Sequence, residues 1–207
     1  MSAPGIELLV GLGNPGARYA ATRHNAGFWW VERLAAAHNE PFRLEPKFHG
    51  LTCRVRLPEG ELRLLKPDTF MNHSGRAVAA MAHYFDLEPA RILLAHDELD
   101  LPVGSVRLKF GGGHAGHNGL RDTIAALGSA DFWRLRIGIG HPGDKRLVTP
   151  YVLGVASASE TALIEQALAV ATQRFPALLT GDFQRVMSQL AAWRPAPDGD
   201  PATPQSA

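Results

Sequence analysis

The sequence predicts an α/β fold, a single three-layer domain around a mixed, mostly parallel, twisted sheet with helices on both faces. Short apolar segments typical of buried strands alternate along the chain with longer segments of helical periodicity. Residues 51–57 and 62–66, separated by a Pro-Glu-Gly turn, have the pattern of a hairpin. A chain of 207 residues is long enough for one well-packed core and too short for two domains to be expected.

The individual elements follow from local patterns. Strands alternate apolar and polar residues or, at 92–95, run continuously apolar as a strand covered on both faces does. Asn25 favours the N-cap position of the first helix, and Ala77, Val78, Met81, Ala82 and Phe85 share one face of the second. The predicted strands are 6–12, 51–57, 62–66, 92–95, 105–110 and 133–140. Helices are expected from Asn25, after 66–72, after 111–119, near 157–175 and near 182–192.

Composition limits the classes of protein. Residues 1–193 form the predicted domain, and the proline-rich residues 194–207 form a disordered tail because they have no apolar periodicity. The net charge of +1 excludes a protein that coats nucleic acid through its overall charge. The single cysteine, Cys53, fits a reducing compartment, and no apolar segment reaches the about 20 residues that span a membrane. We therefore expect a cytoplasmic protein without a signal peptide.

The first loop spells G-x-G-x-x-G at Gly11, Gly13 and Gly16, which invites a dinucleotide-binding interpretation. That motif must open a helix at once, because the pyrophosphate binds at the helix N-terminus. Here residues 15–23 intervene before a credible cap, and the acidic Glu32 falls inside the predicted helix. We therefore expect no dinucleotide at this loop.

A histidine and an aspartate follow two of the predicted strands. His24 lies after the first strand and Asp97 directly after the apolar strand 92–95. Each alone is more often a loop residue that satisfies backbone groups or caps a turn. If the strands are neighbours, the carboxylate can hold the imidazole in one tautomer and leave its other nitrogen as a base. No G-x-S-x-G elbow is present and Ser74 fits a capping role, so water is the expected nucleophile.

Other polar side chains in loops have two interpretations. Asn14, Asn72 and Asn118 fit helix caps or Asx turns, but together they could line one cleft and donate N–H groups to a carbonyl. The residues His96 to Asp100 and the pair His114 and His117 offer metal-ligand types. The glycines before His114 indicate a loop rather than a helix face, so we expect no metal.

Basic residues alternate along two of the predicted strands. Arg107 and Lys109 share a face of the strand 105–110, and Arg134 and Arg136 share a face of the strand 133–140. Such charges are usually solvated. If the two strands are adjacent, they merge into a basic stripe suited to phosphates.

Several sequence blocks, taken together, resemble one family. They are Gly11-Leu-Gly-Asn-Pro-Gly16 with Tyr19, Arg23-His-Asn-Ala-Gly27, Lys66-Pro-Asp-Thr-Phe-Met-Asn72 with Ser74-Gly75, His96-Asp-Glu-Leu-Asp100, Gly111 to Gly119, and Arg134 to Gly143. In this order, across roughly residues 6 to 190, they are similar to bacterial-type peptidyl-tRNA hydrolases.

The resemblance implies an enzyme that cleaves the ester between a peptide and the 3′ ribose of tRNA, as a monomer without a cofactor or metal. It implies that His24 is the catalytic base and that Asp97 keeps it basic and oriented, with Asn14 as the third catalytic residue. Substrate and tRNA contacts are implied, on matching positions, for Tyr19, Phe70, Met71, Asn72, Arg107, Lys109, His117, Asn118 and Arg136. The resemblance therefore implies peptidyl-tRNA as the partner and no association with a membrane.

Two residues depart from the resemblance. Ala115 stands where many relatives carry glycine, which could narrow the peptide-binding loop, and Arg107 stands where some carry lysine. Two other classes stay open at this point. One is an RNA-binding module without hydrolytic activity, and the other is a nicotinamide-dependent reductase.

Overall fold

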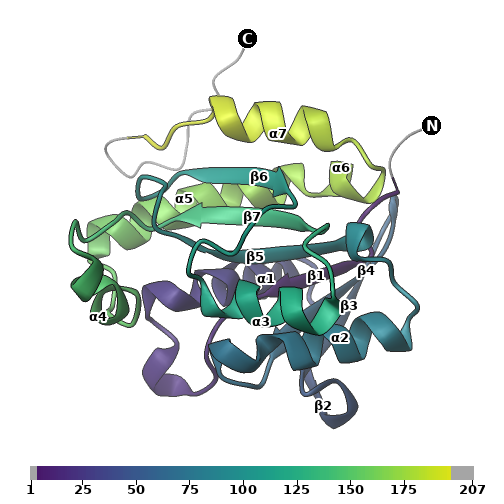
Figure 1. Cartoon of the computed structure of the whole chain (residues 1–207). Coiled ribbons are helices and arrows are strands. Elements are labelled where there is room, and N and C mark those ends of the chain that lie inside the picture. Colours follow the sequence, from purple (N-terminus) through teal and green to yellow (C-terminus); the bar gives the residue numbers. More distant parts are fainter. Residues whose placement is uncertain (1–3, 197–207) are drawn as a thin grey trace.

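The computed structural model describes residues 4–196. Seven strands form one sheet in the order β2-β3-β4-β1-β5-β7-β6 (Figure 1). The strands are β1 (Leu8–Gly11), β2 (Arg43–Glu45), β3 (Gly50–Leu57), β4 (Gly60–Pro67), β5 (Ile92–Glu98), β6 (Val106–Phe110) and β7 (Trp133–Gly138). The α-helices are α1 (Ala26–Ala37), α2 (Ser74–Tyr84), α3 (Asn118–Leu127), α4 (Val148–Val152), α5 (Ala158–Arg174), α6 (Pro176–Leu179) and α7 (Phe183–Ala192).

The central strands β4, β1, β5 and β7 are mutually parallel, while β3 and β6 run antiparallel to their neighbours. The predicted mixed, mostly parallel sheet and the predicted hairpin are confirmed. Because parallel strands end at the same edge, the loops after β1, β5 and β7 meet there, near α4 at the left of Figure 1.

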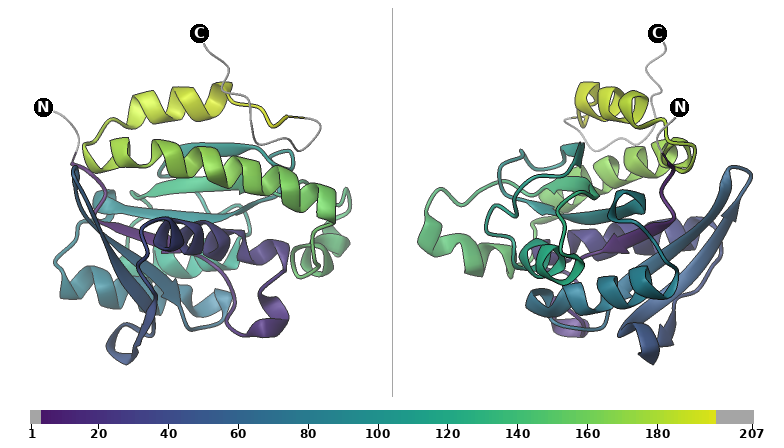
Figure 2. Two further views of the ribbon diagram at one scale, coloured as in Figure 1. Left: turned by 180° about the vertical axis from the view of Figure 1, so that it is seen from behind. Right: turned by 45° about the vertical axis from the view of Figure 1, so that its right-hand side comes forward.

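Two cores flank the sheet. Leu9 and Leu93 contribute to the core under α1 and α5, and Val10 and Leu94 contribute to the core under α2 and α3. Figure 2 shows α1 and α5 on one face and Figure 1 shows α2 and α3 on the other. Strands covered on both faces need apolar residues at every position, which explains the continuous apolar runs in the sequence.

Some elements differ from the prediction. β5 does not end at residue 95 but continues through His96, Asp97 and Glu98, all of them buried. The polar residues continue the strand because β7 pairs with it as far as Glu98. The short helices α4 and α6 were not predicted, because one turn of helix gives too little periodicity to be distinguished from a loop.

Within residues 4–196, no helix is both long and apolar enough to cross a membrane. In the segment predicted as a tail, Arg194 donates to the carbonyl of Ala191 at 2.6 Å, and the amide of Ala196 donates to Gln166 at 3.0 Å. The first residues of that segment are therefore bonded to the domain. The rest of it, residues 197–207, lies outside the described residues.

Candidate active site

Two residues far apart in the sequence meet at the carboxyl ends of neighbouring strands. Nδ1 of His24 donates to Asp97 Oδ1 at 2.9 Å and lies 3.1 Å from Oδ2. Asp97 belongs to β5, and His24 lies in a short 3-10 helix (Arg23–Asn25) that links the loop after β1 to α1. Since β1 and β5 pair in parallel, the predicted neighbourhood of the two residues is confirmed.

Asp97 also accepts a hydrogen bond from a second histidine. Nε2 of His117 donates to Asp97 Oδ1 at 3.0 Å, while its Nδ1 accepts from the amide of Leu120 at 3.3 Å. These partners assign the proton of His117 to Nε2. A third imidazole, that of His96, lies edge-on to His117 at 5.0 Å between ring centroids and donates from Nδ1 to the carbonyl of Asp97.

The environment sets the charge states of these groups. Burial lowers the pKa of His24, but the charge and the hydrogen bond of Asp97 outweigh it, and the net pKa is raised above 6.5. Burial also favours the neutral form of Asp97, yet electrostatic attraction and the hydrogen bonds donated by His24 and His117 hold its pKa well below the usual range. Burial, then the neighbouring His117, lowers the pKa of His96 to about 3. The site therefore contains a carboxylate, a basic imidazole and a neutral buried imidazole.

The amide of Asn14 is fixed in one orientation. Its Oδ1 accepts from the backbone N–H of Met71 at 2.8 Å, so Nδ2 has no protein partner within residues 4–196. Asn25 holds the Asn14 backbone from both sides, accepting from its N–H and donating to its carbonyl, each at 2.9 Å. Asn14 therefore presents a donor, as an oxyanion-stabilising amide must.

Asn25 occupies the predicted N-cap position of α1 but does not use its side chain as a cap. It precedes α1, but its side chain makes no cap hydrogen bond and instead binds Asn14 across the loop. A capping Asn and a loop-bridging Asn look alike in a sequence, because both sit just before a helix. The side chain of Asn25 bonds to the backbone of Asn14 and is therefore not available to cap α1.

The glycines of the first loop serve close packing. A Cβ at Gly11 would lie 2.4 Å from the carbonyl oxygen of Gly27, and one at Gly27 would lie 2.3 Å from that of Ala95. Helix α1 thus approaches β1 and β5 more closely than side chains allow. It begins only at Ala26, well after Gly16. The geometry agrees with the expectation that this loop holds no dinucleotide.

Residues of the loop before α2 line the outer part of the site. Tyr19 and Phe70 meet edge to face with centroids 6.2 Å apart, and both Phe70 and Asn72 are exposed. Met71 is buried, so its side chain belongs to the core and its backbone N–H serves Asn14. Ser74 is fully buried and donates to the carbonyl of Met71, which leaves water as the expected nucleophile.

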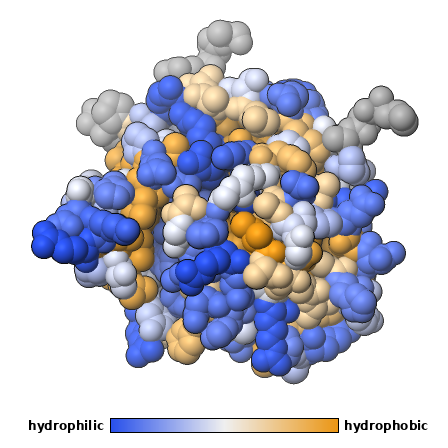
Figure 3. All heavy atoms as spheres, viewed as in Figure 1, coloured by the Kyte–Doolittle hydropathy of each residue, from blue (hydrophilic) through white to orange (hydrophobic). Residues whose placement is uncertain are grey.

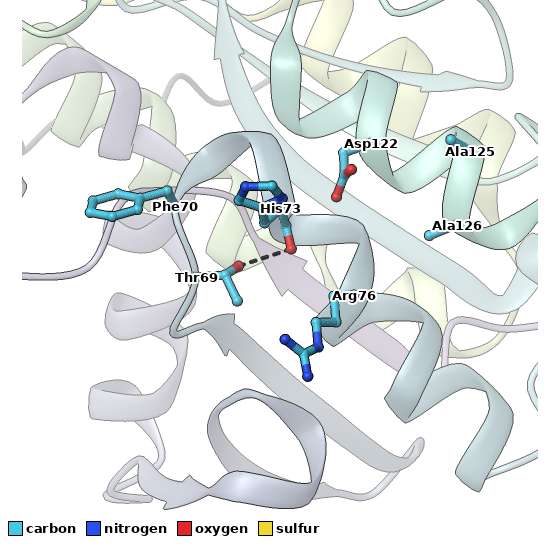
Figure 4. A pocket seen from close by; sticks show the side chains of 7 residues that line it. All are labelled: Thr69, Phe70, His73, Arg76, Asp122, Ala125 and Ala126. Carbon is cyan, nitrogen blue, oxygen red and sulfur yellow. Dashed lines mark hydrogen bonds between the residues drawn. The ribbon is translucent and has the colours of Figure 1, made fainter.

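A depression of about 670 Å³ borders this loop on its outer side. Figure 4 shows Phe70 at one end of it and Asp122 of α3 at another. Asp122 accepts from the N–H of Gly75 at 2.7 Å, which ties α3 to the start of α2. None of the lining residues is His24 or Asp97, so the depression lies beside the pair and does not contain it.

The glycine-rich loop (residues 111–117) leads from β6 to α3. Asn118 is exposed in the first turn of α3, and the capping side chain is that of His117. The interpretation of Asn118 as a cap was therefore wrong, and its amide is free for another role. A Cβ at Gly119 would lie 2.5 Å from Sδ of Met71, so the start of α3 packs against the loop that carries Asn72. The three predicted asparagines thus belong to loops in mutual contact.

The predicted basic strands are neighbours. β6 and β7 pair antiparallel, with Arg107 opposite Arg136 and Lys109 opposite Arg134. Nη1 of Arg107 donates to the carbonyl of Leu190 in α7 at 3.0 Å. Nε of Arg136 donates to Glu98 at 2.8 Å.

The basic side chains differ in their accessibility. Lys109 is exposed and has no ion pair within residues 4–196, whereas Arg134 is only 3% exposed. The predicted stripe therefore exists, but its members are not equally available to a phosphate, since Arg107 is bonded to α7 and Arg134 is buried. Figure 3 shows hydrophilic and apolar residues interspersed on this side of the molecule.

The side chains of His24, Asp97 and His117 form the one group in residues 4–196 with spacing compatible with a metal ion. Nδ1 of His24 and Nε2 of His117 both point at Asp97 oxygens as hydrogen-bond donors. A metal would have to replace both protons, so the arrangement is that of a proton network. Of the metal-ligand types noted in the sequence, Asp97 and His117 belong to this group, whereas His96, Glu98, Asp100 and His114 take part in no such group within residues 4–196.

Two residues, Arg23 and Arg134, have an anchoring role that the sequence did not indicate. Arg23 donates to the carbonyl of Tyr151 at 3.3 Å and to Glu160 at 2.8 Å, which ties the loop of His24 to the segment around α4. Arg134 contacts the glycine-rich loop rather than solvent. The sequence shows the charge of both residues but not their bonding partners, because those partners are distant along the chain.

The fold and the site define a class: a doubly wound α/β enzyme with a hydrogen-bonded histidine–carboxylate pair at the carboxyl edge of its sheet. The family model described as peptidyl-tRNA hydrolase matches residues 8–197. The chain belongs to the peptidyl-tRNA hydrolase family.

Individual relatives agree with this assignment. The chain is 55% identical to a peptidyl-tRNA hydrolase of Pectobacterium carotovorum subsp. carotovorum (strain PC1) over 192 residues, 92% of this chain and 98% of that one. It is 53% identical to that of Coxiella burnetii (strain RSA 331 / Henzerling II) over 186 residues, 90% and 97% of the two chains. The crystal structure of peptidyl-tRNA hydrolase from Acinetobacter baumannii matches with a TM-score of 0.89 at 48% identity, covering 92% of this chain and 97% of that one. The family, the α/β fold and the enzyme class expected from the sequence are confirmed.

Proposed function

We propose that the chain hydrolyses the ester between a peptide and the 3′ ribose of tRNA by attack of a water molecule that His24 deprotonates. The observation that carries the mechanism is the hydrogen bond from His24 Nδ1 to the two carboxylate oxygens of Asp97, which leaves Nε2 as the free ring nitrogen. Asp97 raises the pKa of His24, which makes its free nitrogen a better proton acceptor.

The reaction balances with the groups present. Nε2 of His24 takes a proton from water while the water oxygen attacks the carbonyl carbon of the ester. Nδ2 of Asn14 and the exposed amide of Asn72 donate to the oxyanion or orient the water. When the bond to the ribose oxygen breaks, that oxygen receives the proton from His24, and tRNA and the peptide acid leave.

The substrate is held on both sides of this centre in the proposal. Tyr19, Phe70, Asn118 and the loop that carries His117 contact the peptide and the 3′ end, and Met71 acts through its backbone. Lys109 and Arg136 contact backbone phosphates of the acceptor stem, because both lie on the face of β6 and β7 next to the glycine-rich loop. Arg107 contributes charge to this face but binds no phosphate directly in the proposal, since its guanidinium is bonded to α7.

We further infer a monomer that acts in the cytoplasm without a cofactor or metal. Every residue of the proposed site comes from one chain, and peptidyl-tRNA arises where translation takes place. The domain boundary near residue 193 is part of the same proposal, because α7 is the last helix within residues 4–196 and packs on β6.

The mechanism is tested by turnover of an N-blocked aminoacyl-tRNA. His24→Ala is expected to lower the rate on the order of 10²–10⁴-fold, as loss of a general base does. His83→Ala, an exposed histidine of α2, is the matched control and should act like the parent. Turnover by His24→Ala near the parent rate would contradict the proposal.

The tRNA contact is tested separately by salt dependence. The Lys109→Ala/Arg136→Ala variant should bind tRNA more weakly and lower the slope of log K against log salt by roughly one per lost phosphate contact. Arg56→Ala, which removes an exposed cation of β3, is the control. An unchanged slope in the double variant would refute the phosphate contact.

A further inference from the structure

The side chain of Arg134 leaves the sheet and ends under the glycine-rich loop. Its Nη1 donates to the carbonyl of Gly113 at 2.5 Å, and its Nη2 donates to the carbonyl of Gly112. The guanidinium carbon lies 4.8 Å from the centre of the Phe132 ring. With 3% of its surface exposed, Arg134 has no face left for a solvent-borne phosphate.

The loop that it contacts has little regular structure of its own. Gly111, Gly112 and Gly116 have φ of +64°, +99° and +82°, and Ala115 has φ of +46°. The internal bonds are short-range: His117 N–H to the carbonyl of His114 at 2.8 Å, and Gly116 N–H to Nδ1 of the same residue at 3.1 Å. Such a segment keeps one conformation only when its ends are anchored.

The two ends of the loop are anchored to different strands. At the far end, His117 bonds to Asp97 of β5. At the near end, Gly111 N–H donates to the carbonyl of Phe132 at 2.9 Å, and Arg134 of β7 holds the next two carbonyls. Since β5 and β7 pair directly, with Leu94 opposite Arg134, one rigid sheet fixes both anchors.

Arginine is suited to this position because its planar fork can bond two successive carbonyls at once, which a lysine ammonium on a flexible stem does less well. The placement is costly. Nε of Arg134 is buried without a hydrogen-bond partner within the described residues, and burial followed by the charge of Arg136 lowers the pKa of the guanidinium. A buried donor without a partner costs free energy, which the bonds of the guanidinium to the two loop carbonyls offset.

We propose that Arg134 is a positioning residue for the reaction, which holds the glycine-rich loop so that Asn118 and the loop amides meet the acyl group of the substrate. This inference rests on the proposed function. It assigns to Arg134 a different task from that of Lys109, its neighbour across the strand pair, which is exposed and free to meet phosphate.

The experiment compares Arg134→Gln and Arg134→Lys with Lys109→Ala. Hydrogen exchange is measured on the peptide that covers residues 111–117, together with kcat, KM and the salt slope for an N-blocked aminoacyl-tRNA. In Arg134→Gln the amides of the loop should exchange faster than in the parent. Its kcat should fall about 100-fold, as a displacement of a substrate-binding group by about 1 Å can cause. Its salt slope should equal that of the parent.

Arg134→Lys should show the same changes at smaller size, and it decides the test if the glutamine variant does not fold. Lys109→Ala should leave the loop exchange unchanged and lower the salt slope. The proposal is overturned if loop exchange and kcat in both Arg134 variants match the parent, or if their salt slope falls as in Lys109→Ala. Failure of the general-base mechanism would show in the kcat of His24→Ala instead, because within the described residues His24 bonds to Asp97 and makes no hydrogen bond to the loop.

Discussion

Nδ1 of His24 and Oδ1 of Asp97 lie 2.9 Å apart although 73 positions separate the residues in the chain. Asp97 reaches this distance because β5 extends beyond its apolar run, and His24 because a short 3-10 helix turns it back over the end of β1. The same carboxylate oxygen binds His117. One buried charge therefore orients two imidazoles.

The pH dependence of kcat/KM should follow His24. Only the neutral imidazole accepts a proton, and its pKa is raised above 6.5, so activity should fall as the pH drops through a midpoint above 6.5. In Asp97→Asn the raising charge is lost while burial remains, so the midpoint should move down and the rate should fall. A pH–rate profile of both proteins measures this. A midpoint that does not move would show that Asp97 does not set the basicity.

Asn14→Asp should impair catalysis without unfolding the protein. Oδ1 can still accept from the N–H of Met71, but the donor Nδ2 becomes an oxygen with negative charge beside the developing oxyanion. Loss of one such donor lowers kcat on the order of 10²–10³-fold. Asn39→Asp, in the loop after α1, is the matched control for the added charge. Equal kcat in Asn14→Asp and the parent would exclude Asn14 as the donor.

His96 should make the protein sensitive to acid. Its pKa in the folded chain is about 3 against 6.5 for the free group, so between these values the unfolded chain binds a proton that the native chain does not. The contribution of His96 to the free energy of unfolding is therefore greatest above pH 6.5. It falls as the pH drops, by at most about 1.4 kcal/mol per pH unit. His24, with a raised pKa, and Asp97, with a lowered one, change stability mainly outside the window from pH 6.5 to 4.

Urea midpoints measured between pH 6.5 and 4 check this. His96→Asn keeps a donor near the Nδ1 position but cannot titrate, so its stability should change less across the window. His83→Asn, on the exposed face of α2, should keep the slope of the parent. If the stability of His96→Asn and of the parent changed equally with pH, His96 would not be the source of the acid sensitivity.

Ala115→Gly should be tolerated or stabilise the fold. Ala115 has φ of +46°, a left-handed conformation that costs a residue with a Cβ roughly 1–2 kcal/mol and costs glycine none. The gain is offset by the greater freedom of glycine in the unfolded chain, so we expect a net change within about 1 kcal/mol. Ala125→Gly, in the last turn of α3, is the control and should destabilise by up to about 1 kcal/mol. Thermal unfolding compares them, and a loss in Ala115→Gly as large as in the control would contradict the interpretation.

Local patterns predicted most of the fold. The hairpin, the buried β1 and β5, and helices α2, α5 and α7 appear close to their expected ranges, because period and turn residues are properties of short segments. The order of strands was not predictable, since β1 pairs with both β4 and β5, and parallel pairing joins segments separated by whole helices. The bonds of two asparagine side chains were not predictable for the same reason: Asn25 binds Asn14 across the loop, and His117 rather than Asn118 caps α3.

The amino-acid sequence by itself determined the α/β class, the loop at each strand end and the residue types that could act there, since these follow from periodicity and side-chain chemistry. Only the tertiary structure decided that Asp97 serves two histidines, that Asn25 orients Asn14, and that Arg134 turns from the basic stripe to hold the glycine-rich loop. Those choices depend on hydrogen bonds of a few ångströms between distant segments, and such distances are fixed only once the sheet has assembled.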